Sequence, residues 1–161
     1  MWVCRSGKDS VYFDQFIKEK IIGIPWEGYD YDFNEVTTRD DIKELVKKET
    51  KSDNRTSIST WAGQIYSFCK EMKMGDYVVI PSFRSRHYIF AQIIGEYEYD
   101  GEKSLKHTRK IKIIGKEIKR EELSQSLQYS LGAFRTIFQV DDKELLKKME
   151  VEICEDKEHR K

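Results

Sequence analysis

The chain has 161 residues, 12% of them aromatic and 36% charged, and its 29 Lys and Arg balance its 29 Asp and Glu. This length fits one domain with a hydrophobic core of its own, and the aromatic content argues against a disordered polar chain. The zero formal net charge excludes binding to nucleic acid through overall charge, although a local basic face stays compatible with it.

Targeting and metal-binding patterns are not found in the sequence. No apolar run approaches the ~20 residues that a membrane span needs, and the first residues contain no apolar signal-peptide core. The three cysteines, Cys4, Cys69 and Cys154, lie far apart, so we expect no disulfide framework. Without a CxxC or HxxxH spacing a zinc site has little support. We expect a cytoplasmic chain with no metal, no cofactor and no membrane contact.

The apolar patterns predict strands and helices in a mixed order. Strands are expected over 2–5, 21–24, 77–81, 88–99 with a break at Gly95, 109–114 and 134–140. Helices are expected after a cap at Asp9 or Ser10, after the capping pattern of Thr38 and Asp41, from Ser57 or Ser59 to Met72, and over 120–127 and 141–149.

This order lacks the regular alternation of a doubly wound sheet. We therefore predict an α+β fold: a small mixed β-barrel of about six strands with helices packed outside. Residues 1–140 are expected to form this domain, and residues 141–161 a C-terminal helix with a charged tail or linker.

Basic residues gather in one part of the chain. Residues 103–120 hold eight Lys or Arg and one acid, Glu117. Alternation along a strand puts Lys110 and Lys112 on one face. With the basic turn of the preceding hairpin, the candidates for phosphate contact are Arg84, Arg86, Lys106, His107, Arg109, Lys110 and Lys112. The same pattern also fits a solvated edge strand that lysines protect against pairing.

Trp26 follows Pro25 at the end of an expected strand and precedes an acidic, aromatic loop. An indole there either stacks on a base, worth about 1–3 kcal/mol, or closes the core. Asp30 in the loop either accepts a hydrogen bond from the amino group of a base or is simply solvated. Trp61 lies on the inward stripe of its expected helix with Ile65 and Phe68, so we predict that it packs in the core.

An enzymatic role has weaker support. Cys69 with His107 would make a nucleophile and a base, but no orienting acid or glycine-rich elbow accompanies them. The acids Glu96, Glu98 and Asp100 lack the D…ExK spacing of a metal-dependent nuclease. We therefore expect a chain that is not an enzyme, with a small hydrolase as an alternative.

Five segments taken in order resemble the PUA-like N-terminal domains of Mrr-type restriction endonucleases. They are Trp2-x-x-Arg5-x-Gly7, Ile22-Gly-Ile-Pro-Trp26, Gly75-Asp-Tyr-Val-Val79, Gly95-Glu-Tyr-Glu-Tyr99 and His107-x-Arg109-Lys-Ile111. Ser130-Leu-Gly132 and Thr136-Ile-Phe138 also fit, so the resemblance covers residues 1 to about 140. Such domains look like relatives of EVE and YTH domains, which read modified bases in an aromatic pocket.

The resemblance implies a PUA-like barrel that flips a modified base into a pocket. By that pattern Arg5 and Ser6 lie beside the base and Trp26 forms one wall. The second cage tryptophan of YTH domains falls at Ile113 in this chain, which is a departure. The opposite wall would then be Ile113, Tyr97, Tyr99 or Tyr29.

The resulting hypothesis is a non-catalytic reader of a modified, methylated base in DNA. It would be the specificity part of a restriction or anti-phage defence system, with a nuclease domain or subunit as its partner. The alternatives are an RNA modified-base reader of YTH type and a nucleotide or nucleoside sensor that regulates a partner effector.

Overall fold

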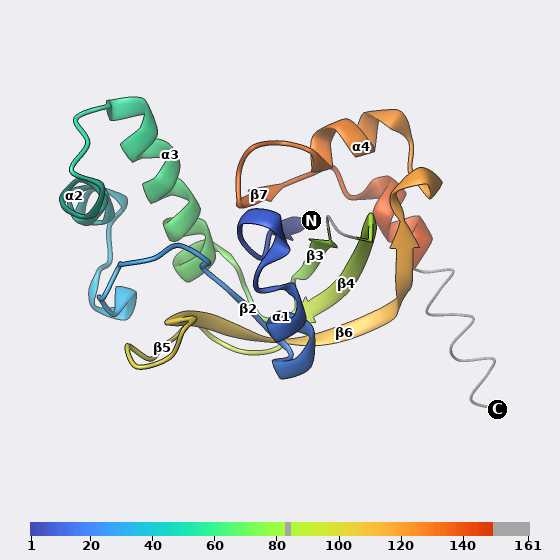
Figure 1. Ribbon diagram of the computed structural model, residues 1–161, viewed down its shortest axis with the longest axis horizontal. Helices are drawn as coiled ribbons and strands as arrows, with labels where there is room; N and C mark the ends of the chain where they lie inside the picture. The colour runs from blue at the N-terminus through green and yellow to red at the C-terminus, as the bar shows by residue number, and fades with distance from the viewer. Residues whose placement is uncertain (83–84, 150–161) are drawn as a thin grey trace.

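The computed structural model describes residues 1–82 and 85–149 as a mixed α+β fold around one curled sheet (Figure 1). The strands are β1 (Trp2–Cys4), β2 (Ile21–Gly23), β3 (Tyr77–Ser82), β4 (His87–Ile93), β5 (Glu98–Tyr99), β6 (His107–Lys119) and β7 (Ile137–Gln139). The helices are α1 (Phe13–Glu19), α2 (Arg39–Thr50), α3 (Arg55–Tyr66) and α4 (Gln125–Leu131), with a last helix over 143–149. The short turns η1 (Lys8–Ser10), η2 (Phe33–Glu35) and η4 (Arg120–Glu122) are 3₁₀, and η3 (Ser67–Glu71) is a π turn that follows α3.

The strand order is β2-β6-β4-β3-β1-β7, with β5 paired to the start of β6. β1 runs parallel to β3, and the other pairs are antiparallel. The 13-residue strand β6 pairs with β2 and β5 through its first part and with β4 through the rest. It curves along its length and so joins the β2 and β5 part of the sheet to the β4 part (Figure 1). The curl brings Cys4 Sγ within 3.7 Å of the Gly23 carbonyl oxygen. The sheet is therefore a half-barrel.

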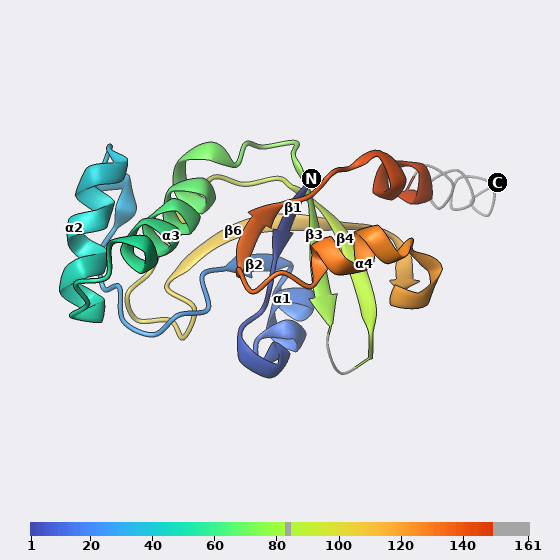
Figure 2. The ribbon, with the colours of Figure 1, turned by 90° about the horizontal axis from the view of Figure 1, so that it is seen from above.

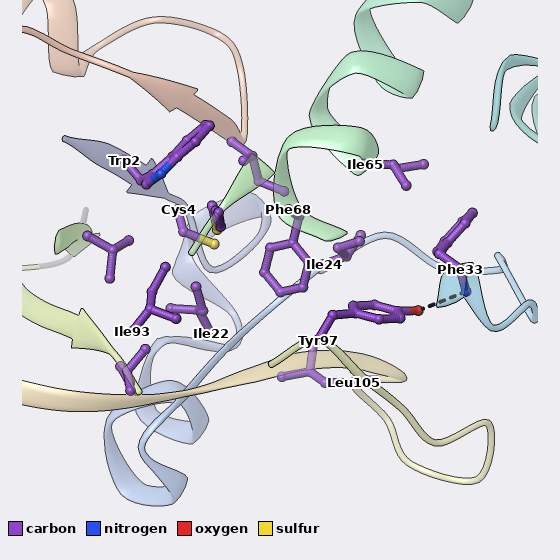
Figure 3. Packing of buried hydrophobic residues seen from close by; sticks show 14 of the residues in the cluster. Trp2, Cys4, Ile22, Ile24, Phe33, Ile65, Phe68, Ile93, Tyr97 and Leu105 are labelled. Carbon is purple, nitrogen blue, oxygen red and sulfur yellow. Dashed lines mark hydrogen bonds between the residues drawn. The ribbon is translucent and has the colours of Figure 1, made fainter. Parts of the chain in front are cut away.

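Side chains alternate across this sheet and build two hydrophobic clusters. The first lies under α1, α2 and α3, and its buried members include Phe16 and Ile42. Ile65 and Phe68 of the same cluster are labelled in Figure 3. The second lies on the other face, under α4 and the last helix, and contains Leu127, Leu131, Leu145 and Met149. Because Leu145 and Met149 are buried in it, the segment after residue 140 packs onto the same domain up to residue 149; residues 150–161 lie outside the described ranges.

The predicted α+β class is confirmed, and the sheet is a half-barrel where a small barrel was predicted. Several element boundaries also differ. Asp9 and Ser10 have φ of 56° and 55°, so neither caps a helix, and α1 begins at Phe13 without a side-chain cap. α3 begins earlier than predicted because Asn54 Oδ1 accepts from the Ser57 N–H. The helix expected over 120–127 is displaced to α4, whose cap is Ser124.

Candidate functional site

Trp26 lies on the loop after β2, is half-buried, and packs against Trp61 of helix α3. Its ring centroid is 4.5 Å from that of Trp61, with the planes tilted by 53°, and 6.2 Å from that of Tyr29. Trp61 is also only partly buried. The two indoles therefore form a partly exposed aromatic corner, a surface on which a base can stack.

Trp61 thereby departs from its predicted place in the core. The fully buried apolar residues of α3 are Ile58, Ala62 and Ile65, which define the centre of its inward stripe. Trp61 falls at the flank of that stripe, where it packs against the first cluster and stays partly exposed. The narrower stripe of Ile58, Ala62 and Ile65 is the sequence signal that would have placed it there.

The end of β1 brings Ser6 and Gly7 against the residue before Trp26. A Cβ built on Gly7 would lie 3.3 Å from Cβ of Pro25, and Gly7 has a φ of 91°, so this close approach favours glycine. Ser6 is 1% exposed, and its Oγ has no hydrogen-bond partner among the residues that the structure describes. A buried hydroxyl without a partner costs about 1–3 kcal/mol. A bound group that hydrogen-bonds to it would remove that cost.

A buried hydrogen-bond chain fixes the loop that carries Trp26. His107 Nε2 lies 2.7 Å from the Tyr29 carbonyl oxygen, which can only accept, so Nε2 carries the proton. Nδ1 then accepts from the Tyr97 hydroxyl at 2.6 Å. The Tyr97 oxygen in turn accepts from the Phe33 N–H at 3.2 Å (Figure 3). His107 on β6 thus holds the loop at Tyr29 directly and at Phe33 through Tyr97, on the two sides of the acidic residues of the loop.

His107 and Arg109 do not face solvent, so the structure does not support their predicted phosphate contacts. His107 is 1% exposed and Arg109 4%. The Arg109 guanidinium donates to the carbonyl oxygens of Gly95, Phe68 and Met72, at 3.2, 3.1 and 2.8 Å, and so fixes the end of η3. The alternation that turns Lys110 outward turns residues 107 and 109 inward.

Tyr97 and Tyr29 are buried rather than lining an open pocket. Tyr29 has a φ of 54°, and its phenol oxygen is buried with no hydrogen-bond partner in the described part of the chain. Burial, with a smaller contribution from the Glu49 carboxylate, raises the pKa of Tyr29 to about 12. Its ring packs against that of Trp26 in a tilted arrangement. The neighbouring Asp30 is exposed and forms an ion pair with Lys106.

The outer face of β6 carries the lysines as predicted. Lys110 and Lys112 are exposed, and Ile111 is buried on the opposite side. Lys110 Nζ is 4.0 Å from a Glu98 carboxylate oxygen, at the limit of an ion pair. Ile113 lies opposite Ala91 and packs against the first cluster, so the ring found against Trp26 comes from α3 instead.

The remaining candidates lie in the hairpin turn and at the end of β1. Arg86 is exposed between β3 and β4, whereas Arg84 falls outside the described residues. Arg5 Nη2 donates to the Leu131 carbonyl oxygen at 2.9 Å, and burial lowers its pKa. Arg5 therefore points toward α4 and not toward the aromatic corner.

Residues 2–141 match the model of a family described as Domain of unknown function (DUF8426). The chain belongs to this family. The matched range runs from β1 to just beyond β7, so both indoles of the aromatic corner, Ser6 and the buried His107 lie within the DUF8426 domain. No protein with curated annotation matches the chain.

Within this DUF8426 domain the thiol considered as a nucleophile is unfavourably placed for one. Burial raises the pKa of Cys69 well above its ordinary value, which holds it as the protonated thiol. In the described ranges, His, Cys, Asp and Glu side chains form no group of three that could hold a metal ion. None of the helices described there has the length and apolar character needed to cross a bilayer.

Proposed function

We propose that this protein is a non-catalytic nucleic-acid-binding module that reads a modified base in DNA with Trp26 as its stacking surface. The observation that carries the proposal is the partly exposed pair of indoles, Trp26 and Trp61. Next to Trp26 in the chain, Pro25 approaches Gly7, and the adjacent Ser6 has a buried hydroxyl with no partner among the described residues. A PUA-like architecture is part of the proposal. Its support is the half-barrel sheet, together with the close approach of the two segments, Ser6-Gly7 and Pro25-Trp26, that carry the resemblance.

The energetics suit recognition of one extruded base. Taking a base out of a duplex costs a few kcal/mol, and stacking on an indole returns about 1–3 kcal/mol. A hydrogen bond to Ser6 Oγ adds to this by ending its lack of a partner. Because His107 and Tyr97 already hold the loop, less conformational entropy is lost on binding. A methyl group on the base gains apolar contact with the second indole, Trp61.

The biological setting follows from the resemblance. We propose that the module supplies specificity in a restriction or anti-phage defence system, acting on behalf of a nuclease domain or subunit. The protonated Cys69 thiol supports a binding role over hydrolysis. Lys110 and Lys112 on the outer face of β6 would add attraction to phosphates that does not depend on base sequence.

The test replaces Trp26 by Ala and measures binding to matched duplexes with and without one methylated base at fixed salt. We expect the preference for the methylated duplex to disappear while the domain stays folded by circular dichroism. Tyr129→Ala is the control, because Tyr129 is an aromatic side chain on α4 that is 87% exposed. A Trp26→Ala protein that keeps the wild-type preference would contradict the proposal.

Two further arms separate the alternatives. A methylated single-stranded RNA of the same sequence tests the RNA reader, since the 2′-hydroxyl distinguishes the two nucleic acids. Calorimetry with free methylated nucleosides tests the sensor. If either ligand binds more tightly than methylated DNA, the DNA assignment is wrong, even where Trp26 is needed.

A further inference from the structure

A cavity lies on the face of the sheet opposite to the one against which Trp26 and Trp61 pack. It has a volume of about 270 Å³ and sits where the β3–β4 hairpin, the end of β6 and the end of α4 meet. Helix α4 lies across β3 and β4 at this place (Figure 2). Its lining combines the apolar residues Pro81 and Leu131 with polar groups from Ser82, Tyr88, Arg86 and Arg120.

The sheet register holds these groups side by side. Pro81 lies opposite Tyr88, and Tyr88 lies opposite Ile118 on β6. Beyond that point the Arg120 N–H donates to the Arg86 carbonyl oxygen at 2.9 Å, which joins the hairpin turn to the end of β6. Arg5 reaches the same region from β1, where it binds the carbonyl oxygen of Leu131.

The charges around this cavity are one-sided. The whole chain has as many acids as bases, yet the described lining contains two arginines and no acid. Neither Arg86 nor Arg120 forms an ion pair with another described residue. An adjoining cavity of about 520 Å³ shares both arginines and adds Lys119 together with one acid, Glu121. A bound anion would relieve the repulsion between these cations.

Neutral donors complete the walls. Burial raises the pKa of Tyr88, with Arg120 and Arg5 acting in the opposite direction, so its hydroxyl stays protonated and can donate. Ser82 is 7% exposed, and its Oγ accepts from Ser85 Oγ at 2.9 Å, so its own O–H can point elsewhere. Guanidinium groups combined with hydroxyl donors match the acceptor-only oxygens of phosphate.

We propose that this cavity binds a phosphate group, carried either by a free nucleotide or by a nucleic-acid backbone, with Arg86 and Arg120 as its charged ligands and Ser82 and Tyr88 as neutral donors. Two residues of its lining, Tyr88 and Leu131, belong to the second hydrophobic cluster, whereas Trp26 packs against the first. It is therefore independent of base recognition at Trp26, and either site can fail its test alone.

The test is a thermal-unfolding titration of the full chain with inorganic phosphate, with chloride at equal ionic strength as the reference. A ligand that binds the folded state raises the midpoint in proportion to the logarithm of its concentration. We expect phosphate to raise the midpoint above the chloride reference. Arg120→Gln and Arg86→Gln should each weaken binding at least tenfold, while Arg55→Gln, at an exposed arginine that lines no described cavity, should not.

Both cavity variants change exposed side chains, and circular dichroism checks that they stay folded. Equal midpoint shifts in phosphate and chloride, or wild-type phosphate binding in both variants, would overturn the proposal. A nucleoside monophosphate and a short single-stranded DNA then identify the source of the group. Binding of either ligand supports the site if the Arg120→Gln protein no longer binds it. The ligand that binds more tightly is then the source of the phosphate group.

Discussion

The hydroxyl of Tyr97 offers the sharpest test of how the Trp26 loop is held. It donates to His107 Nδ1 at 2.6 Å and accepts from the Phe33 N–H at 3.2 Å, in a buried place. Tyr97→Phe keeps the ring and leaves both partners buried without a hydrogen bond. Each unsatisfied group costs about 1–3 kcal/mol, so we expect a loss of about 2–5 kcal/mol. In a chain of this length 1 kcal/mol shifts the midpoint by about 2–4 °C, which predicts a fall of about 4–20 °C.

Urea unfolding followed by circular dichroism measures this loss. Tyr99→Phe is the matched control, because the Tyr99 ring lies 5.1 Å from that of His107 but its hydroxyl makes neither of these hydrogen bonds. The control should lose less than about 0.5 kcal/mol. If Tyr97→Phe is no less stable than Tyr99→Phe, the hydrogen-bond chain does not hold the loop.

Three further predictions follow from the same contacts. Neutralising Lys110 and Lys112 to Gln should weaken binding to methylated and plain DNA equally and flatten the log–log salt dependence by roughly one unit per lost phosphate contact; an unchanged slope would assign these lysines to edge protection. Burial lowers the pKa of His107, so as the pH falls this imidazole is protonated in the unfolded chain before it is in the folded one, and the free energy of unfolding should fall below about pH 6.5. His107→Gln should lose part of that pH dependence, and a pH profile identical to the wild type would refute the role of His107. Arg109→Met leaves three carbonyl oxygens without their donor and should cost about 2–4 kcal/mol in urea unfolding, whereas a cost under about 0.5 kcal/mol would show that the guanidinium is not needed.

Local sequence patterns predict most of the strands and helices of the fold. The alternation of β6 was predicted from Lys110 and Lys112, and it is confirmed by the buried Ile111. The same alternation, continued by three residues toward the N-terminus, would also have turned Arg109 and His107 inward. Grouping them with the lysines by charge gives the wrong face, because charge alone does not say which face of a strand a residue occupies.

The differences from the prediction have local causes in two places and a long-range cause in one. The turn at Asp9 and Ser10 has positive φ values that no capping pattern reveals. The pairing of Trp26 with Trp61 joins a loop to a helix 35 positions further along, and no periodicity links them. Helix α4 begins at Gln125 and not at residue 120, because Ser124 Oγ accepts from the Leu127 N–H and caps it. A serine three residues before Leu127 is a sequence signal for this start.

The most direct measurement of base recognition is the indole N–H spectrum of the protein during titration with a duplex that carries one methylated base. The chain has three tryptophans, whose signals can be assigned by single Trp→Phe variants. Trp2 is an internal control, because it is 6% exposed and its Nε1 donates to Asp76 at 3.1 Å. We predict that the Trp26 signal moves with the methylated duplex, less with the plain one, and that the Trp2 signal stays in place. A Trp26 signal that does not move while the methylated duplex binds would contradict the account.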